Sequence, residues 1–143
     1  MLLTPFTAIS AIDGRYSDKT DILRPLCSEY GLFYFRVLIE IRWLQALAAH
    51  SGIQEISKFS PTTQQQLNDI IKNFSLEDAE RIKFLEKTTR HDIKAVEYFL
   101  KERMAKLSFF PIFLTKHHIK KHRNNYRKIS LIICFLLQPK HES

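Results

Sequence analysis

The chain has 143 residues, of which 45% are hydrophobic and 26% charged. This balance suits a single globular domain with its own core and excludes a wholly disordered protein, which contains fewer apolar residues. The longest apolar run, at 131–137, is much shorter than the roughly 20 residues that span a bilayer as a helix. We therefore expect no membrane span, and the lack of a signal-peptide pattern predicts a cytoplasmic protein.

The net charge of +7 is unevenly distributed along the chain. Residues 108–143 hold seven lysines and arginines and one acidic residue, whereas residues 1–107 hold 15 basic and 14 acidic residues. The body is therefore nearly neutral, and the basicity belongs to the tail. Such a tail can attract nucleic acid or anionic membranes without specificity.

The chain contains only three glycines, which leaves little material for β-hairpins or for glycine loops that bind phosphate. One of them predicts a turn at Asp13-Gly14-Arg15-Tyr16, because glycine tolerates a positive φ angle. On these residues alone, Arg15 is a solvated surface side chain. The scarcity of glycine and of strand patterns predicts an all-α body.

The first long helix is predicted at residues 29–50, which carry apolar side chains on several faces. A helix that is apolar around so much of its circumference is expected to be covered on more than one side. Among them, Leu32, Phe35, Ile39, Trp43 and Leu47 recur at helical spacing. Some of these apolar side chains, Phe35, Trp43 and also Leu100 further on, are expected to be left exposed in this chain.

Two further helices are predicted in the middle of the chain. Ser60 and Pro61 have the residue types of an N-cap and a first helical position, and Leu67, Ile70, Ile71 and Phe74 would form one face of the helix that follows. Ser75 opens the next helix, whose first turn is acidic. Charge pairs four residues apart are expected there between Glu77 and Arg81 and between Glu86 and Arg90.

The segment Thr88-Thr89-Arg90-His91-Asp92 places a polar, ionisable cluster immediately before a helix predicted at 92–106. The free N–H groups and positive dipole end of a helix favour an anionic ligand. The alternative is that Asp92 is an ordinary helix cap with His91 as a half-exposed neighbour. The helix itself is expected to pair Glu97 with Lys101 and to bury Ile93, Val96, Leu100, Met104 and Leu107.

Together, the Asp13–Tyr16 and Thr88–Asp92 segments resemble the N-terminal part of adenylosuccinate lyase, a member of the fumarase/aspartase superfamily, and the resemblance extends over residues 3–107. It implies an all-α, N-terminal helical domain of the fumarase/aspartase-like lyase fold, truncated before the central helical bundle. It also implies a substrate-binding role for Arg15, Tyr16, Arg90, His91 and Asp92. Guanidinium, phenol and imidazole groups suit such a role, because each can donate hydrogen bonds to phosphate or carboxylate oxygens.

The family eliminates fumarate from adenylosuccinate, and from a succinylated carboxamide ribonucleotide of purine biosynthesis, by proton abstraction and protonation of the leaving nitrogen. The family's serine base and histidine acid have no counterpart in this chain. We therefore expect no catalytic residue, no metal and no cofactor here, and no lyase activity from this chain alone. The resemblance implies adenylosuccinate as the nucleotide substrate and a homotetramer for the full-length family, which this fragment is not expected to form.

Residues 108–143 match none of these patterns, and we interpret them as a frameshifted or non-homologous tail. Their Lys, Asn, Ile and Phe content fits A/T-rich codons that are translated in a wrong frame. A zinc site that uses His118 and His122 is disfavoured, because its ligands lack the usual paired spacing. The alternative function is a non-enzymatic, polyanion-binding protein that acts through this tail, although we expect no specific nucleic-acid or membrane partner.

Overall fold

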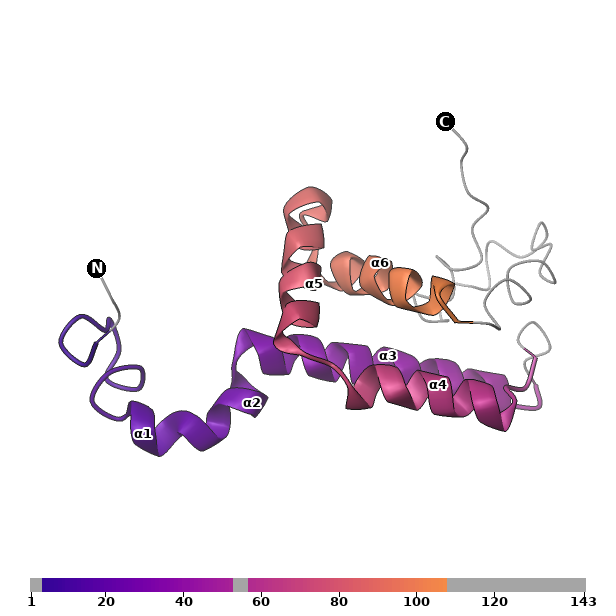
Figure 1. Ribbon diagram of the computed structural model, residues 1–143, viewed down its shortest axis with the longest axis horizontal. Helices are drawn as coiled ribbons and strands as arrows, with labels where there is room; N and C mark the ends of the chain where they lie inside the picture. The colour runs from indigo at the N-terminus through magenta and orange to yellow at the C-terminus, as the bar shows by residue number, and fades with distance from the viewer. Residues whose placement is uncertain (1–3, 53–56, 108–143) are drawn as a thin grey trace. The chain divides into compact units, whose positions relative to one another are not determined.

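The computed structural model describes residues 4–52 and 57–107, and every regular element within those ranges is a helix (Figure 1). The expectation of an all-α body is therefore confirmed for the described part of the chain. The chain divides into two compact units, the first ending at Phe33 and the second beginning at Tyr34. Each unit is described by itself below.

The first unit contains three short helical elements that the sequence patterns did not predict: α1 (Ser17–Thr20), η1 (Asp21–Leu23) and α2 (Arg24–Cys27). Each is about one turn long and buries no residue, so it leaves no apolar periodicity to detect. A hydrogen bond of 3.1 Å from the Thr20 hydroxyl to the Ile12 carbonyl oxygen ties this helical stretch to the preceding turns.

Gly14 is buried in the first unit, but its role differs from the expected one. No glycine in the described residues has a positive φ angle. A Cβ at position 14 would instead lie 3.0 Å from the Ala8 Cβ and 3.1 Å from the Pro5 carbonyl oxygen. Close packing, rather than a left-handed backbone, therefore favours glycine at this position.

The long helix α3 (Glu29–Ala49) begins in the first unit and continues into the second. Its buried residues in the second unit are Val37, Ile41, Leu44, Leu47 and Ala48. Of the five residues that recur at helical spacing only Leu47 is buried, and the expected exposure of Phe35 and Trp43 is confirmed. Phe35, Ile39 and Trp43 are 37%, 61% and 44% exposed. Because α3 is apolar all round, its periodicity fits two faces equally well, and the packing of its neighbours decides between them.

Helix α4 (Pro61–Lys72) begins as expected, with the Ser60 hydroxyl accepting a hydrogen bond of 3.1 Å from the Thr63 N–H. Leu67 and Ile71 are buried on one face, and Phe74 is buried just beyond the helix end. Polar contacts join α4 to α3: the Arg42 guanidinium donates to the Asn68 side-chain oxygen at 2.6 Å, and the Gln45 amide donates to the same oxygen at 3.2 Å.

Helices α5 (Leu76–Thr89) and α6 (Asp92–Ala105) pack against each other (Figure 1). Their buried apolar side chains are Ala79, Ile82, Ala95, Val96, Phe99, Leu100 and Met104, so the expectation of an exposed Leu100 is wrong. Val96, Leu100 and Met104 are confirmed as the stripe of α6, whereas Ile93 is 37% exposed. Because α5 and α6 bury their apolar faces against one another, they form a helical hairpin.

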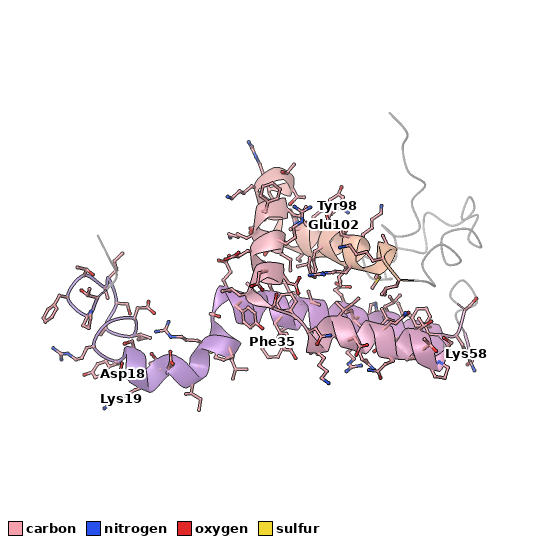
Figure 2. The ribbon with its side chains drawn as sticks, viewed as in Figure 1. Asp18, Lys19, Phe35, Lys58, Tyr98 and Glu102 are labelled. Atoms are coloured by element: carbon pink, nitrogen blue, oxygen red, sulfur yellow. The ribbon has the colours of Figure 1, made fainter. Side chains whose placement is uncertain are left out.

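Charged residues also join the two helices of this hairpin. The Arg81 guanidinium donates two hydrogen bonds, of 3.0 and 2.6 Å, to the Glu102 carboxylate (Figure 2 labels Glu102 on α6). Arg103 pairs with Asp78, a buried carboxylate that also completes a capping box with Ser75 at the start of α5. The expected pair within α5 between Glu77 and Arg81 is therefore wrong, because a partner on the neighbouring helix takes its place.

No helix in the described part of the chain is long and apolar enough to cross a membrane. The basic tail at 108–143 lies outside the described residues, as do His118 and His122. The expected domain boundary at residue 107 therefore stays a prediction.

We expect Asp78→Ala to lower the free energy of unfolding by about 1–3 kcal/mol, because it removes an N-terminal cap and leaves Arg103 without its carboxylate partner. Denaturant unfolding followed by circular dichroism measures this change. The matched control is Glu80→Ala, which removes an exposed carboxylate from the same helix and should change stability by less than about 0.5 kcal/mol. Equal effects of the two substitutions would contradict the role given to Asp78.

Candidate functional site

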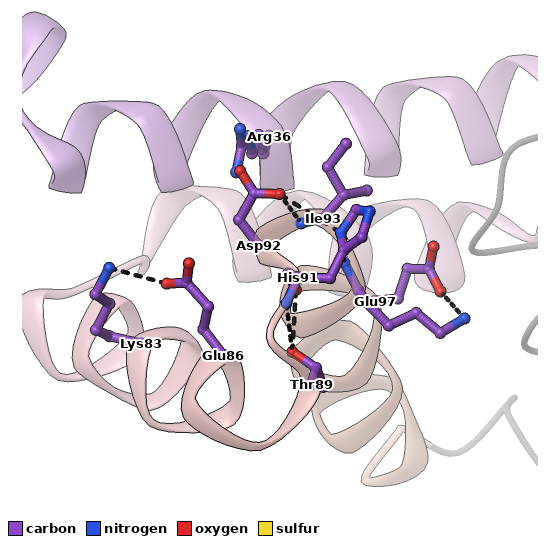
Figure 3. A network of polar contacts seen from close by, with 9 residues as sticks. Arg36, Lys83, Glu86, Thr89, His91, Asp92, Ile93 and Glu97 are labelled. Atoms are coloured by element: carbon purple, nitrogen blue, oxygen red, sulfur yellow. Dashed lines mark hydrogen bonds and ion pairs between the residues drawn. The ribbon is translucent and has the colours of Figure 1, made fainter.

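The turn between α5 and α6 positions the ionisable cluster predicted from the sequence (Figure 3). Arg90 ends α5 in the left-handed conformation, with φ of 51°, and its N–H donates to the Glu86 carbonyl oxygen at 2.8 Å. The Thr89 hydroxyl then donates to the His91 carbonyl oxygen at 3.0 Å and accepts from the His91 N–H at 3.4 Å. Side-chain and backbone bonds thus fix the chain on both sides of the turn.

The N-cap of α6 is His91, not Asp92 as expected from the sequence. The Lys94 N–H donates to His91 Nδ1 at 3.4 Å. Asp92 is the first helical residue, where its Oδ1 accepts from the Ile93 N–H at 2.7 Å and its Oδ2 lies 2.7 Å from Arg36 Nη1 on α3. The Asp92 carboxylate thus pairs with Arg36 on α3, while the imidazole of His91 occupies the capping position.

These contacts change how the end of α6 can bind an anion. The N–H groups of Ile93 and Lys94 already donate to the chain's own side chains. The expectation of free N–H groups is therefore wrong at these two positions, and an anion would have to displace a cap to reach them. The His91 side chain is 58% exposed and is the group that this end of the helix offers to a ligand.

Asp92 is held in its charged form. The close contact with the Arg36 guanidinium lowers the pKa of the Asp92 carboxyl below its ordinary value, and the hydrogen bond from the Ile93 N–H acts in the same direction. Partial burial opposes the shift, while the positive charge of Arg36 and the nearby His91 ring add to it. His91 Nδ1 lies 3.5 Å from Asp92 Oδ1, so the imidazole stands beside a carboxylate whose charge Arg36 offsets.

The expected pair between Glu86 and Arg90 is wrong. Glu86 instead lies 2.9 Å from the Lys83 ammonium group, one turn back on α5 (Figure 3). The positive φ angle at Arg90 turns this residue out of the helical repeat that would align the two side chains. Arg90 is consequently an exposed side chain next to His91.

Arg15 and Tyr16 belong to the first unit, where both are exposed. The Arg15 guanidinium carbon and the Lys19 ammonium nitrogen each lie 6.0 Å from the centre of the Tyr16 ring. Two cations therefore surround one phenol, which is a suitable arrangement for an anionic ligand. No group of three or more His, Cys, Asp or Glu side chains within the described ranges could hold a metal ion.

Sequence patterns did not identify Arg36 as a residue of this site, and they placed Thr89 in the cluster without giving it a role. Arg36 lies on another helix, and only the fold brings it to Asp92. Thr89 had a local signal, because a hydroxyl two residues before a helix cap commonly bonds to the backbone of the turn. The cluster is thus built from α3, the end of α5 and the start of α6.

The lowered pKa of Asp92 predicts a pH-dependent contribution to stability. A carboxyl whose pKa is lower in the folded state stabilises the fold above its unfolded pKa of about 3.9, and this contribution is lost as the pH falls through the folded pKa. We expect Asp92→Asn to destabilise the fold at neutral pH, with a difference from the native chain that shrinks below about pH 4. Urea unfolding across this range tests the expectation, which a difference that is independent of pH would contradict.

Comparison with known proteins gives an independent view of these residues. No family profile matches the chain. Adenylosuccinate lyase of Escherichia coli K12 is 54% identical over 107 residues, which cover 75% of this chain and 24% of the relative. Adenylosuccinate lyase of Vibrio cholerae is 53% identical over 105 residues, which cover 73% of this chain and 23% of the relative. Adenylosuccinate lyase of Buchnera aphidicola subsp. Schizaphis graminum is 42% identical over 118 residues, which cover 82% of this chain and 26% of the relative.

The chain thus spans about a quarter of the length of the curated relatives that it matches. Identity of this level over about three quarters of the chain, on an all-helical structure, confirms the resemblance and the fold class inferred from the sequence. The matched residues, about three quarters of this chain, are therefore similar to about a quarter of the length of an adenylosuccinate lyase.

Proposed function

We propose that residues 4–107 supply nucleotide-binding contacts of an adenylosuccinate lyase and that this chain does not catalyse the reaction alone. The observation that supports this proposal most is the exposed His91 ring at the start of α6, in a segment that is homologous to these lyases. The proposed ligand is adenylosuccinate, which presents phosphate and carboxylate oxygens. The proposed binding residues are Arg15, Tyr16, Arg90, His91 and Asp92.

The chemistry of the cluster supports an anionic ligand. His91 and Arg90 are exposed at the same turn and both can donate hydrogen bonds. A bare carboxylate at Asp92 would repel such a ligand, but Arg36 lies 2.7 Å from it and compensates the charge. The site therefore presents hydrogen-bond donors to an anion, and the negative charge of Asp92 is offset by Arg36.

The remaining parts of the proposal concern the setting of these contacts. We place the domain boundary near residue 107; most of the relatives match over 103 to 107 residues, and one matches over 118. The base, the acid and the tetramer scaffold would come from the parts of a lyase that this chain does not span. The proposed location of the protein is the cytoplasm. The exposed Phe35, Ile39 and Trp43 on α3 form an apolar surface suited to contact with such parts.

The first test is fumarate release from adenylosuccinate, followed by absorbance. We expect no release above a no-enzyme control from this chain alone. A chimera in which residues 1–107 replace the matched part of the Escherichia coli lyase should be active. In that chimera, His91→Ala should lower kcat/KM at least about tenfold, because it removes a charge-assisted hydrogen bond to substrate.

The matched control in the chimera is His50→Ala. His50 is also exposed, and its Nδ1 also accepts a backbone N–H, from Gly52 at 3.1 Å. Its loss should leave kcat/KM within about twofold of the parent chimera. Fumarate release by the chain alone would overturn the expected inactivity, and a His91→Ala chimera with parental kinetics would overturn the proposed binding role.

A further inference from the structure

The contact between Arg36 and Asp92, which compensates the carboxylate charge, also bears on the orientation of His91. The Arg36 guanidinium lies on α3, with the side chain 26% exposed, and its Nη1 is 2.7 Å from Asp92 Oδ2. Arg36 therefore touches the carboxylate behind the site (Figure 3). The effect of this pair on the neighbouring imidazole follows from a competition at the start of α6.

Two side chains can cap the same N–H group at this helix end. The N-cap side chain accepts from the second or third residue after it, so Lys94 N–H is within the reach of a cap at position 91 or at position 92. Aspartate is among the preferred N-cap residues and histidine is not. Even so, the Lys94 N–H donates to His91 Nδ1. Something must therefore hold the better competitor away.

Asp92 is held by contacts to both of its oxygens. Oδ2 pairs with Arg36, and Oδ1 accepts from the Ile93 N–H at 2.7 Å. The same guanidinium also lowers the pKa of Asp92, which keeps the carboxylate charged and paired. On the other side, the two hydrogen bonds between Thr89 and the His91 backbone fix the residue that takes the cap.

We propose that Arg36 is a positioning residue, which holds Asp92 against α3 so that His91 caps α6 through Nδ1 and presents Nε2–H to an anionic oxygen of the ligand. The proposal rests on the binding role given to His91 above. Because Nδ1 accepts a hydrogen bond, the neutral ring carries its proton on Nε2. That nitrogen is the donor available to a phosphate or a carboxylate.

The test uses the full chain, uniformly labelled with ¹⁵N so that both nitrogens of the bond are observed, at about pH 8, where an ordinary imidazole is neutral. NMR coupling across the hydrogen bond between Lys94 nitrogen and His91 Nδ1 should be present in the native chain. Arg36→Leu should abolish it, and Arg36→Lys should retain it. The double variant Arg36→Leu/Asp92→Ala should restore it, because the competing carboxylate is gone.

Controls separate positioning from general damage. Arg81→Leu breaks another interhelical ion pair, that with Glu102, and should leave the coupling intact. The Gly52 to His50 bond should persist in every variant. Arg36→Gln serves in place of Arg36→Leu if the latter does not fold. Coupling that survives the loss of Arg36, or that the double variant does not restore, would overturn the proposal.

A ligand titration distinguishes this proposal from the proposed function. AMP carries phosphate without the dicarboxylate, and fumarate carries carboxylates without phosphate. If the His91 Nε2 resonance moves with only one of the two ligands, that ligand identifies whether phosphate or carboxylate oxygen is bound. Arg36→Leu should raise the Kd of that ligand about tenfold, which corresponds to the loss of about one hydrogen bond to a charged group. Coupling present with no response to either ligand would overturn the binding role of His91 while supporting the positioning role of Arg36.

Discussion

The ion pair between Arg36 and Asp92 is the interaction on which the site depends. It joins α3 to the first residue of α6 within the second unit, and it decides which side chain caps that helix. With Asp92 held by Arg36, His91 becomes the cap and its ring stands at the exposed end of α6. The orientation of the imidazole therefore depends on helix packing, because the packing brings Arg36 on α3 close to Asp92 on α6.

Much of the fold could be predicted from the sequence, because its signals are local. Ser60 with Pro61 and Ser75 with Asp78 mark helix starts by capping chemistry that needs no tertiary information. The buried face of α3 could not be predicted, since an apolar helix offers two equivalent stripes. The expected pair between Glu77 and Arg81 failed for a related reason: Arg81 finds Glu102 on α6, and a bidentate bond to a neighbouring helix outweighs a weak pair along the same helix.

The sequence predicted which residues form the candidate site, but it did not predict how their side chains contact one another. The types and spacing of Arg90, His91 and Asp92 indicated an ionisable helix start, yet the cap was assigned to the wrong residue because the partner of Asp92 lies on α3. Likewise, the backbone N–H groups that seemed available for an anion are occupied by side chains. We therefore propose that this helix end binds an anion through its side chains.

The most direct measurement is a titration of the full, ¹⁵N-labelled chain with inorganic phosphate, in which the His91 ring and the Ile93 and Lys94 amides are observed together. Binding through the side chain predicts that the His91 Nε2 resonance moves while both amides keep their hydrogen-bonded shifts and slow exchange. Large movements of the two amides with an unaffected ring would mean that the anion displaces the caps and binds the helix backbone. That result would contradict a site built on His91.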